Sequence, residues 1–302
     1  SDSLPDAYFA CGGDDDTKPA HDLGTRLSDI NGDGLPDLIQ MFLPSNGFYK
    51  DEPQRRIYLN TGSSFSYSST YSDDLPDAYF CATDGGERGW DLGTRLADMN
   101  GDALPDLVQL FLSRSGYYDN NTVRRIYLNT GSGFSYSSSF SNDLPDTYFM
   151  GGGNGDTLRE YDMGTRLADI NNDGYTDLIQ LFLPYNGWYE NENQRRVYLN
   201  TGDGFYKHSG YSDTLEDMYF AAGGNDENNI IGSNMGTRLT DLNGDGLLDL
   251  VQSFLSQNGW YEGVPQRRVQ YNNGSGWESA DDSIIPDTYF NFGRTDGTPN
   301  EP

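Results

Sequence analysis

Asp29-Ile-Asn31-Gly-Asp33-Gly-Leu35-Pro-Asp37 is the first of four copies of one nine-residue pattern. In every copy Asp or Asn stands at positions 1, 3, 5 and 9, around a tight turn. The copies start at residues 29, 98, 169 and 241, so the chain is built from a repeated unit of about 70 residues. The other three copies are Asp98-Met-Asn100-Gly-Asp102-Ala-Leu104-Pro-Asp106, Asp169-Ile-Asn171-Asn-Asp173-Gly-Tyr175-Thr-Asp177 and Asp241-Leu-Asn243-Gly-Asp245-Gly-Leu247-Leu-Asp249.

These loops carry the oxygen atoms that a hard divalent cation needs. Calcium takes six to eight oxygen ligands at about 2.3–2.6 Å, and short Asp and Asn side chains on a curling loop can converge at that distance. We therefore expect about four Ca²⁺ ions, one per loop, each holding the turn between two strands. The expected ligands are the side chains at positions 1, 3, 5 and 9 and the backbone carbonyl at position 7: Asp29, Asn31, Asp33, Leu35, Asp37, Asp98, Asn100, Asp102, Leu104, Asp106, Asp169, Asn171, Asp173, Tyr175, Asp177, Asp241, Asn243, Asp245, Leu247 and Asp249.

Two substitutions distinguish the loops from one another. Ala103 stands where the other loops have Gly, directly after the third ligand, so we expect the second site to be strained or weaker. Asn172 replaces Gly at position 4 of the third loop and is expected to be harmless. The alternative for all four loops is a set of Asx-rich turns that bind no metal.

The repeat organises the whole chain of 302 residues. Segments 1–71, 72–140, 141–211 and 212–281 align end to end, and 282–302 begins a fifth copy, so we expect a single repeat domain. Apolar runs of strand length alternate with Gly-rich turns, and no stretch keeps a period of 3.6. Four short strands per repeat predict an all-β fold with very little helix, namely a β-propeller of four blades. A solenoid of stacked β-units is the alternative.

The stretch from Gly-Thr-Arg-Leu through the nine-residue loop to Asp-Leu-Ile-Gln resembles the FG-GAP/VCBS repeat. That repeat forms propeller blades in integrin α-subunit heads, in fungal lectins and in the shell proteins of bacterial toxin complexes. The resemblance covers the core of every repeat, around half of the chain, and implies a calcium-bearing propeller. It does not by itself imply a ligand. The Leu-Pro-Asp-x-Tyr-Phe and Asn-Gly-Trp-Tyr pieces lie outside the general family pattern.

The two ends of the repeat array do not balance. Four loops accompany five copies of a Tyr-Phe segment, namely Tyr8-Phe9, Tyr79-Phe80, Tyr148-Phe149, Tyr219-Phe220 and Tyr289-Phe290. One interpretation is that the last copy completes the first blade and fastens a closed ring. Another is that the surplus segment docks on a neighbouring molecule by strand addition. A third is that the chain is cut from a longer array.

The charge of the chain excludes several classes of partner. With 47 acidic and 19 basic residues, the formal net charge is −28. Nucleic acid and anionic membranes are therefore not expected as partners, because both require basic patches. No apolar run approaches 18 residues, so no membrane insertion is expected. The sequence shows neither an initiator Met nor a leader, and we expect a mature or excised chain that is secreted. Calcium binding would relieve self-repulsion and couple metal binding to folding.

Two cysteines and two Asn sites bear on an extracellular location. Cys11 and Cys81 lie in adjacent repeats, either as a disulfide that staples the first two repeats or as two small buried side chains. Asn120 and Asn273 begin Asn-x-Thr and Asn-x-Ser triplets, which are glycosylation acceptors.

Aromatic side chains recur at a loop tip in each repeat, beside Asn, Gly and acidic residues. Such tips suit carbohydrate recognition, because an aromatic ring stacks on a sugar face and amides bind hydroxyls. The alternative is a hairpin turn whose rings pack against the next blade. The candidate ligand-binding residues are Phe48, Tyr49, Tyr117, Tyr118, Trp188, Tyr189, Trp260 and Tyr261.

Arginines are also locked to the repeat. They precede each loop at Arg26, Arg95, Arg166 and Arg238, and they recur as pairs at 55–56, 124–125, 195–196 and 267–268. One interpretation is a set of anion- or sugar-binding guanidinium groups. The other is pairing with the many Asp residues, since the Arg fork matches a carboxylate.

Catalysis is not expected. His21 and His208 are the only histidines and stand at unrelated places in their repeats, and near-identical repeats suit multivalent binding better than a single active site. We expect a calcium-stabilised extracellular binding or adhesion module, lectin-like, whose partner is a glycan or an extracellular protein. The alternatives are a structural subunit of a filament or coat that assembles through its terminal segment, and a fragment of a toxin-complex shell.

Overall fold

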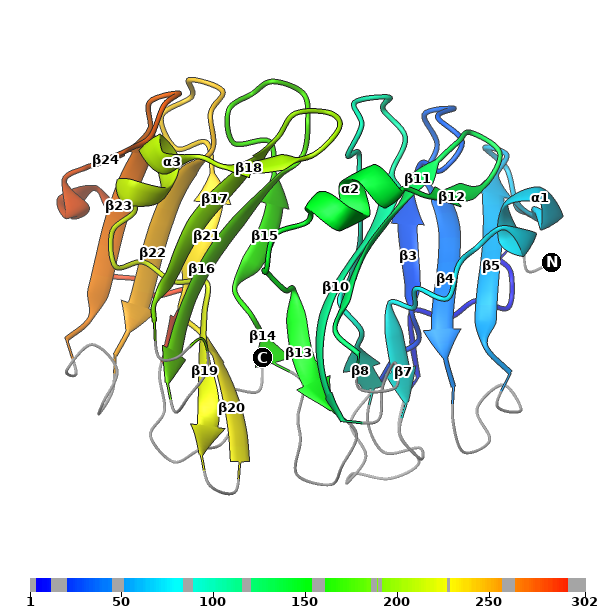
Figure 1. Cartoon of the computed structure of the whole chain (residues 1–302), viewed down its shortest axis with the longest axis horizontal. Coiled ribbons are helices and arrows are strands. Elements are labelled where there is room, and N and C mark those ends of the chain that lie inside the picture. Colours follow the sequence, from blue (N-terminus) through cyan, green and yellow to red (C-terminus); the bar gives the residue numbers. More distant parts are fainter. Residues whose placement is uncertain are drawn as a thin grey trace. The chain divides into compact units, whose positions relative to one another are not determined.

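The computed structural model describes residues 4–11, 21–44, 52–83, 89–115, 121–153, 161–185, 189, 192–226, 229–256 and 264–292. The chain divides into two compact units, Ser1–Leu144 and Pro145–Pro302. Each unit is described by itself. Both consist mainly of β-strands joined by turns, with a few short helices (Figure 1).

The first sheet of unit 1 combines strands from two successive repeats. Its order is β6-β5-β4-β7-β8, and β3 pairs with β4 as well. The bounds are β3 (Thr25–Ser28), β4 (Asp37–Leu43), β5 (Gln54–Asn60), β6 (Phe65–Tyr67), β7 (Cys81–Thr83) and β8 (Gly89–Asp91).

Two strands share one edge of β4. The first half of β4 pairs antiparallel with β3, and its end pairs parallel with β7 from the following repeat. Met41 marks the change: its N–H donates to the carbonyl of Gly24 at 2.9 Å, and its carbonyl accepts from the N–H of Phe80 at 3.0 Å. The second repeat thus lends its Tyr-Phe segment to the sheet of the first repeat.

Gly24 is required at this crossing. Its φ is +65°, and a Cβ at this position would lie 2.4 Å from the carbonyl oxygen of Met41. Only glycine combines the left-handed backbone with such a close approach. The equivalent Gly164 has the same constraint, with a Cβ position 2.3 Å from the carbonyl oxygen of Leu181.

Unit 1 contains a second sheet segment and an N-terminal hairpin. In the segment β10 pairs with β9 and β11, and β11 pairs with β12. In the hairpin β1 pairs antiparallel with β2. The bounds are β1 (Ala10–Cys11), β2 (His21–Asp22), β9 (Thr94–Ala97), β10 (Asp106–Ser115), β11 (Val123–Asn129) and β12 (Phe134–Tyr136).

Unit 2 repeats the plan with a hairpin and two sheets. In its first sheet β16 lies between β17 and β19, and β15 shares its edge; in its second, β22 lies between β21 and β23. The bounds are β13 (Met150–Gly153), β14 (Tyr161–Asp162), β15 (Thr165–Ala168), β16 (Asp177–Tyr185), β17 (Gln194–Asn200), β18 (Phe205–Lys207), β19 (Ala221–Asp226), β20 (Asn229–Asn234), β21 (Thr237–Thr240), β22 (Asp249–Leu255), β23 (Gln266–Asn272), β24 (Trp277–Ser279) and β25 (Asn291–Phe292).

The fifth Tyr-Phe copy takes its place in the fourth sheet. Strand β25 runs parallel to β22, with Phe254 opposite Asn291. This corrects the interpretation that the last copy completes the first blade. The physical reason is proximity along the chain, since the segment follows β24 directly.

Short helices follow the outermost strand of three repeats, and the sequence did not predict them. They are α1 (Ser69–Asp73), α2 (Ser138–Asp143) and α3 (Ser209–Asp213), with a 3-10 turn at Asp282–Ile284. In α1 the side chain of Ser68 caps the N-terminus by accepting the N–H of Tyr71. One-turn helices are too short to show a 3.6-residue period.

The prediction of an all-β fold with four similar sheet units and little helix is confirmed for the described residues. Aliphatic and aromatic side chains fill the sheets: Phe42, Phe182 and Phe254 on the central strands are fully buried. In the part of the chain that the structure describes, no helix has the length and apolar character of a membrane span.

Candidate functional site

The nine-residue loops close the hairpins between the first and second strands of each sheet. In the first repeat Ser28 faces Asp37 across the hairpin, so residues 29–36 form the turn. The carboxylate of Asp29 accepts N–H bonds from Gly32 at 2.8 Å, Asp33 at 3.1 Å and Gly34 at 2.8 Å. These bonds curl the backbone around the carboxylate at position 1.

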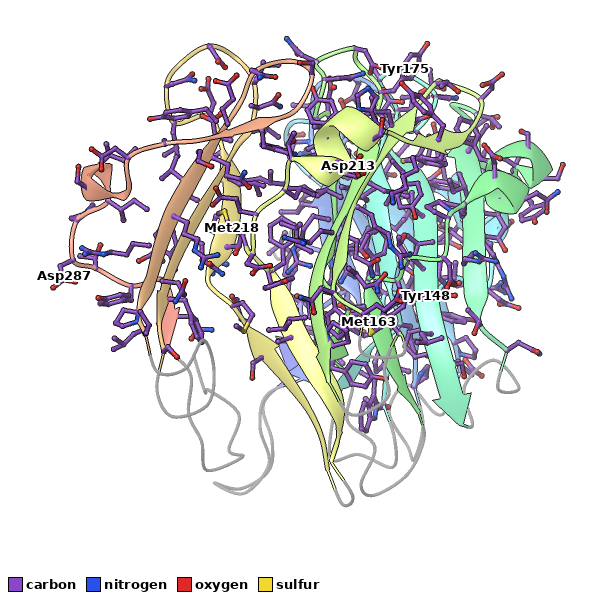
Figure 2. All side chains as sticks on the ribbon, turned by 60° about the vertical axis from the view of Figure 1, so that its left-hand side comes forward. Tyr148, Met163, Tyr175, Asp213, Met218 and Asp287 are labelled. Atoms are coloured by element: carbon purple, nitrogen blue, oxygen red, sulfur yellow. The ribbon has the colours of Figure 1, made fainter. Side chains whose placement is uncertain are left out.

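Positions 3 and 5 of the loop also turn their oxygens towards the backbone. Asn31 Oδ1 accepts the N–H of Asp33 at 3.0 Å, and Asp33 Oδ1 accepts the N–H of Leu35 at 2.9 Å. Positions 1, 3 and 5 therefore contribute their oxygens along one tight turn. The fourth loop has the same bonds at Asp245 and Leu247. In the third loop, Tyr175 at position 7 lies at the upper edge of unit 2, well above Met163 (Figure 2).

The second and third loops show how the two substitutions are accommodated. Ala103 has a φ of +67° and Asn172 a φ of +59°, in the left-handed region that favours glycine. The N–H of Ala103 still reaches the Asp98 carboxylate at 2.8 Å. The strain expected at the second loop is therefore borne by the backbone of Ala103, while Asn belongs to the residue types that enter this region more readily.

The Asp at position 9 has a structural contact that the sequence did not reveal. Asp37 is fully buried and accepts the N–H of Ile30 at 2.9 Å and the N–H of Asn60 at 2.7 Å. It therefore joins the start of the loop to the end of β5. Asp106, Asp177 and Asp249 are also fully buried and make the same two kinds of bond.

Burial and neighbouring charge make two of these carboxylates, Asp106 and Asp177, unusual acids. Burial raises the pKa of Asp106 to about 7, and the charges of Asp102 and Asp98 add to the effect. The pKa of Asp177 is raised to about 7 by burial, with the same kind of contribution from Asp173 and Asp169. Each loop thus concentrates negative charge beside a carboxylate that water does not reach, and a cation would relieve this.

The donor set of each loop fits a hard cation in its chemistry, because it consists of carboxylate, amide and carbonyl oxygens. Among the described residues, no group of three or more His, Cys, Asp or Glu side chains forms a metal-binding cluster. A cation at the first loop would therefore also require the amide oxygen of Asn31 and the carbonyl of Leu35. Both oxygens of Asp37 already accept backbone N–H groups.

Of the predicted loop-tip aromatic residues, only Tyr189 lies within the described part. Its hydroxyl accepts a hydrogen bond from Gln180 Nε2 at 3.2 Å, and its ring lies 6.0 Å from that of Phe182. Arg196 lies over the same ring at 5.7 Å, and burial raises the pKa of Tyr189 to about 12. This ring packs against its own sheet. Outside the described residues lie Phe48, Tyr49, Tyr117, Tyr118, Trp188, Trp260 and Tyr261.

Exposed tyrosines lie instead on the outermost strands, where the sequence analysis did not place a site. Tyr67 on β6 faces Tyr58 on β5, with ring centroids 5.6 Å apart in an edge-to-face arrangement. Tyr136 on β12 faces Tyr127 on β11 in the same way, also at 5.6 Å. Both outer rings are 52% exposed. The alternation of Phe-Ser-Tyr along a short strand was the signal that could have found them.

The tyrosine pair is lost in the second half of the chain. Tyr198 faces Lys207 in the third repeat, and Gln270 faces Ser279 in the fourth. An exposed aromatic ring remains in the third repeat, at Tyr206. The outer strands therefore differ between repeats, whereas the loops remain alike.

Three of the four arginines that precede the loops pair with Asp residues, and the fourth, Arg238, contacts Asn234. Arg26 contacts Asp22 at 2.6 Å, and Arg95 contacts Asp91 at 2.7 Å. Members of the paired arginines do the same, as Arg55 lies 2.9 Å from Asp77. These ion pairs support the interpretation that the repeated arginines stabilise the sheets by pairing with Asp residues.

The cysteine and glycosylation predictions stay open. Cys81 is buried, and its Sγ donates to the carbonyl of Asp22 at 3.0 Å, while the side chain of Cys11 lies outside the described part. Asn273 is exposed, and its Nδ2 donates to Glu278 at 2.7 Å. Asn120 lies outside the described residues.

Comparisons with known proteins give remote structural likenesses only. No protein-family model matches the chain, and no curated protein matches it. Among solved structures, the chain is similar to an Agrocybe aegerita lectin studied for its recognition of non-reducing terminal N-acetylglucosamine. The TM-score is 0.37 at 17% identity, over 84% of this chain and 64% of the lectin chain.

A second similar structure is that of the Photorhabdus luminescens Tc holotoxin pore. The TM-score is 0.24 at 17% identity, over 85% of this chain and 14% of the toxin chain. The chain thus spans less than two thirds of the length of either structure. At these TM-scores the likenesses carry no argument about function.

Proposed function

We propose that the chain is a calcium-stabilised β-propeller of four FG-GAP-like blades that binds glycans on extracellular surfaces at repeated sites. The observation that carries glycan binding is the recurrence of an exposed tyrosine pair, Tyr58 with Tyr67 and Tyr127 with Tyr136, at the same place in two successive repeats. The role is binding rather than catalysis.

An edge-to-face tyrosine pair provides an aromatic face and hydroxyl groups, both of which can bind a sugar ring. The negative face of an aromatic ring attracts the weakly positive C–H groups of a sugar, and the phenol hydroxyl can bond to sugar hydroxyls. Tyr67 and Tyr136 have half of their surface open, so a flat ligand can reach them. Each contact is small, but several weak sites that engage one surface raise the apparent affinity by about 10²–10⁴.

Calcium has a structural part in this proposal. When bound, it would neutralise the carboxylates at positions 1 and 5 and hold the turn that aligns the first two strands. The chain's own residues shape the loop. The position-1 Asp accepts two or three backbone N–H groups, and the position-9 Asp joins the loop to the third strand. The residues offered to the ion are those at positions 1, 3, 5, 7 and 9 of each loop, and the position-9 carboxylate also accepts two backbone N–H groups.

The propeller arrangement rests on the exchange of strands between repeats. The first, third and fourth sheets each take an inner segment from the part of the chain that follows their own repeat, and such exchange is suited to a ring of blades. Small-angle scattering in calcium would test it, since four blades in a ring scatter as a compact particle and a solenoid as an elongated one.

Glycan-array binding tests the proposed function with matched variants. The double variant Tyr67→Ala, Tyr136→Ala should lose most binding, whereas Tyr206→Ala should lose less because Tyr206 lacks the tyrosine partner across the strands. A further arm, Trp188→Ala with Trp260→Ala, tests the loop tips. Binding that survives the first double variant and disappears in the second would move the site to the tips. An array without any bound glycan would refute the proposal.

A chelator experiment tests the calcium part separately. Calcium at a hundredfold excess over its dissociation constant should add about 2.7 kcal/mol per site to the free energy of unfolding. Melting with calcium and with EDTA measures this, and Asp33→Ala provides the control because it removes one ligand from one loop. Identical melting curves in both conditions would contradict calcium stabilisation.

A further inference from the structure

Within each unit, one asparagine reaches from its own repeat into the loop of the repeat before it. Asn129, at the end of β11, donates its Nδ2 to the carbonyl of Ile30 in the first loop at 2.8 Å. In unit 2 Asn272, at the end of β23, makes the same bond to Ile170 in the third loop at 2.7 Å. All four residues are buried, so water does not compete for these bonds. The same contact between repeats is therefore built twice.

The backbone of each asparagine holds the position-9 Asp of its own repeat. The N–H of Asn129 donates to the carboxylate of Asp106 in the second loop at 2.7 Å. The N–H of Asn272 donates to the carboxylate of Asp249 in the fourth loop at 2.9 Å. One residue thus contacts two successive loops, the earlier one through its side chain and the later one through its backbone.

The isoleucine completes the connection in the earlier loop. The N–H of Ile30 donates to the carboxylate of Asp37 at 2.9 Å, and in unit 2 Ile170 makes the equivalent bond to Asp177 at 2.8 Å. A continuous path of short hydrogen bonds therefore joins the position-9 carboxylates of two successive loops, through one isoleucine and one asparagine. Both ends of each path are carboxylates that the proposed function offers to a cation.

Side-chain packing joins the same two loops in unit 1. Leu104 stands at position 7 of the second loop, and its Cδ2 lies 3.0 Å from the place that a Cβ on Gly32 of the first loop would take. Its Cδ1 lies 3.8 Å from the equivalent place at Gly131, whose carbonyl accepts the hydroxyl of Tyr71 at 2.6 Å. A shift of the first loop would therefore press on the residue whose carbonyl the second loop offers to a cation.

Asn60 is the counterpart of these asparagines in the first repeat and shows the local contacts alone. Its N–H donates to Asp37 at 2.7 Å, its Nδ2 donates to the carbonyl of Pro36 at 3.1 Å, and its Oδ1 accepts the N–H of Gly62 at 2.9 Å. Asn129 makes all three of these bonds in its own repeat as well. Among the residues that the structure describes, Asn60 has no bond to a second loop, so the bond between loops is additional to the local turn.

We propose that Asn129 and Asn272 are positioning residues that make cation binding cooperative, between the first and second loops and between the third and fourth. Ordering of the first loop by an ion fixes the Ile30 carbonyl, and this fixes Asn129 and, through its backbone, the Asp106 carboxylate. The second loop then has less conformational freedom left to lose, so its own ion binds more tightly. The proposal rests on the calcium binding proposed above and is independent of glycan binding.

A double-mutant cycle in the full chain tests the coupling in unit 1. Asp33→Ala removes a ligand from the first loop, and the methyl group of Ala103, the only alanine in the four loops, reports calcium binding at the second loop by NMR. Asp33→Ala should weaken the calcium affinity measured at Ala103 by about fivefold or more, the usual range for coupled sites. In an Asn129→Ala background the same change in the first loop should leave the affinity at Ala103 unaltered.

Asn60→Ala is the matched control, because it removes the same local side-chain bonds and no bond between loops. In this background Asp33→Ala should still weaken the affinity at Ala103 by the full factor. Unit 2 provides an independent cycle, which also serves if Asn129→Ala does not fold. There Asp173→Ala should weaken calcium binding at the fourth loop, read at the Gly246 amide, and Asn272→Ala should abolish that effect.

Three results would overturn the proposal. The first is an affinity at Ala103 that Asp33→Ala leaves unchanged, which would mean that the loops bind independently. The second is coupling that survives Asn129→Ala in full, and the third is coupling that Asn60→Ala abolishes equally, which would assign it to the local turn. An Ala103 signal in the wild-type chain that does not respond to millimolar calcium would refute calcium binding itself, a result distinct from independent loops.

Discussion

The first and fourth sheets of the chain share a pattern of backbone hydrogen bonds and differ in how their side chains are buried. In both, the residue at the crossing of the central strand donates its N–H to a preceding glycine: Met41 to Gly24 at 2.9 Å, and Ser253 to Gly236 at 3.1 Å. The side chains on this plan diverge, with Asn234 in place of Asp22 and Ser253 in place of Met41.

This difference shows that the backbone hydrogen bonds of a sheet and the burial of its side chains have different causes. Glycine, Asp and Thr residues at fixed places in the repeat reproduce the same backbone bonds in both sheets. Burial depends on which other segments lie against the sheet, as the nearly inaccessible Phe80 and the half-exposed Phe290 show. Stability should therefore follow the neighbours of a residue rather than its place in the repeat.

The largest expected loss of stability follows from truncating the Phe ring that the two sheets bury to different extents. Phe80→Ala should cost about 3–5 kcal/mol of unfolding free energy, because a fully buried ring leaves a cavity. Phe290→Ala, at the equivalent position of the fourth sheet, should cost less than half as much because solvent already reaches its ring. Chemical denaturation of both variants measures the difference, and equal losses would mean that the fourth sheet is as well packed as the first.

The next largest effect is at the glycines beside the central strands, where substitution should destabilise the two sheets by similar amounts. Gly24→Ala and Gly236→Ala should each cost about 3 kcal/mol or more, because each adds a Cβ at 2.4 or 2.6 Å from a backbone carbonyl oxygen. Gly34→Ala is the control: it has the same left-handed backbone but no atom within 4 Å of its Cβ, so only about 1–2 kcal/mol is expected. Urea denaturation of the three variants tests this, and a loss at Gly34 as large as that at Gly24 would contradict it.

A pH experiment tests the buried carboxylate at the end of the second loop, where the loop joins its sheet. Asp106, with its pKa raised to about 7 by burial, binds a proton more tightly in the folded chain than in the unfolded chain, where the pKa is near 3.9. The free energy of unfolding should therefore fall as the pH rises from about 4 to about 7 in chelator. Thermal melting across this range measures it.

Asp106→Asn is the variant that isolates this group. It should lower stability because an amide cannot accept both backbone N–H groups with two oxygens, and it should also flatten the pH dependence. Calcium favours the ionised carboxylate, so its stabilising effect should be greater at pH 7 than at pH 5. A stability that rises with pH in chelator would contradict the raised pKa.

The smallest effect tests the Asp–Arg pair that the fourth sheet lacks. Arg238 contacts Asn234 at 3.3 Å where Arg26 contacts Asp22 at 2.6 Å. Asn234→Asp should add about 0–1 kcal/mol, the usual range for an exposed ion pair, and the gain should shrink in salt. Asp22→Asn is the reciprocal variant. A gain that is independent of salt would argue that charge is not its cause.

Much of the fold could be predicted because it depends on local patterns. The four loops, the β-rich repeats and the position of the loops between two strands follow from residues such as Asp29, Asn31 and Gly34 along one stretch of chain. The pairing of arginines with Asp was one of two interpretations, and Arg26 with Asp22 supports it. The one-turn helices escaped because they are shorter than the period that would reveal them.

The candidate site was predicted in part. The position-9 Asp was expected as a metal ligand, which stays a prediction, while its bond to Asn60 depends on a strand 23 residues away. The exposed pair of Tyr58 and Tyr67 depends on the register between two strands, which the sequence does not state.

The sequence alone determined the repeat, the all-β class and the tight turns, because oxygen-bearing side chains and glycines act on backbone within a few residues. Only the tertiary structure decided which repeat lends Phe80 to which sheet, why Asp106 is a buried acid, and why Tyr8 and Phe9 lie exposed while identical pairs are core. Burial is a property of neighbours, and segments with the same sequence have different neighbours in different sheets.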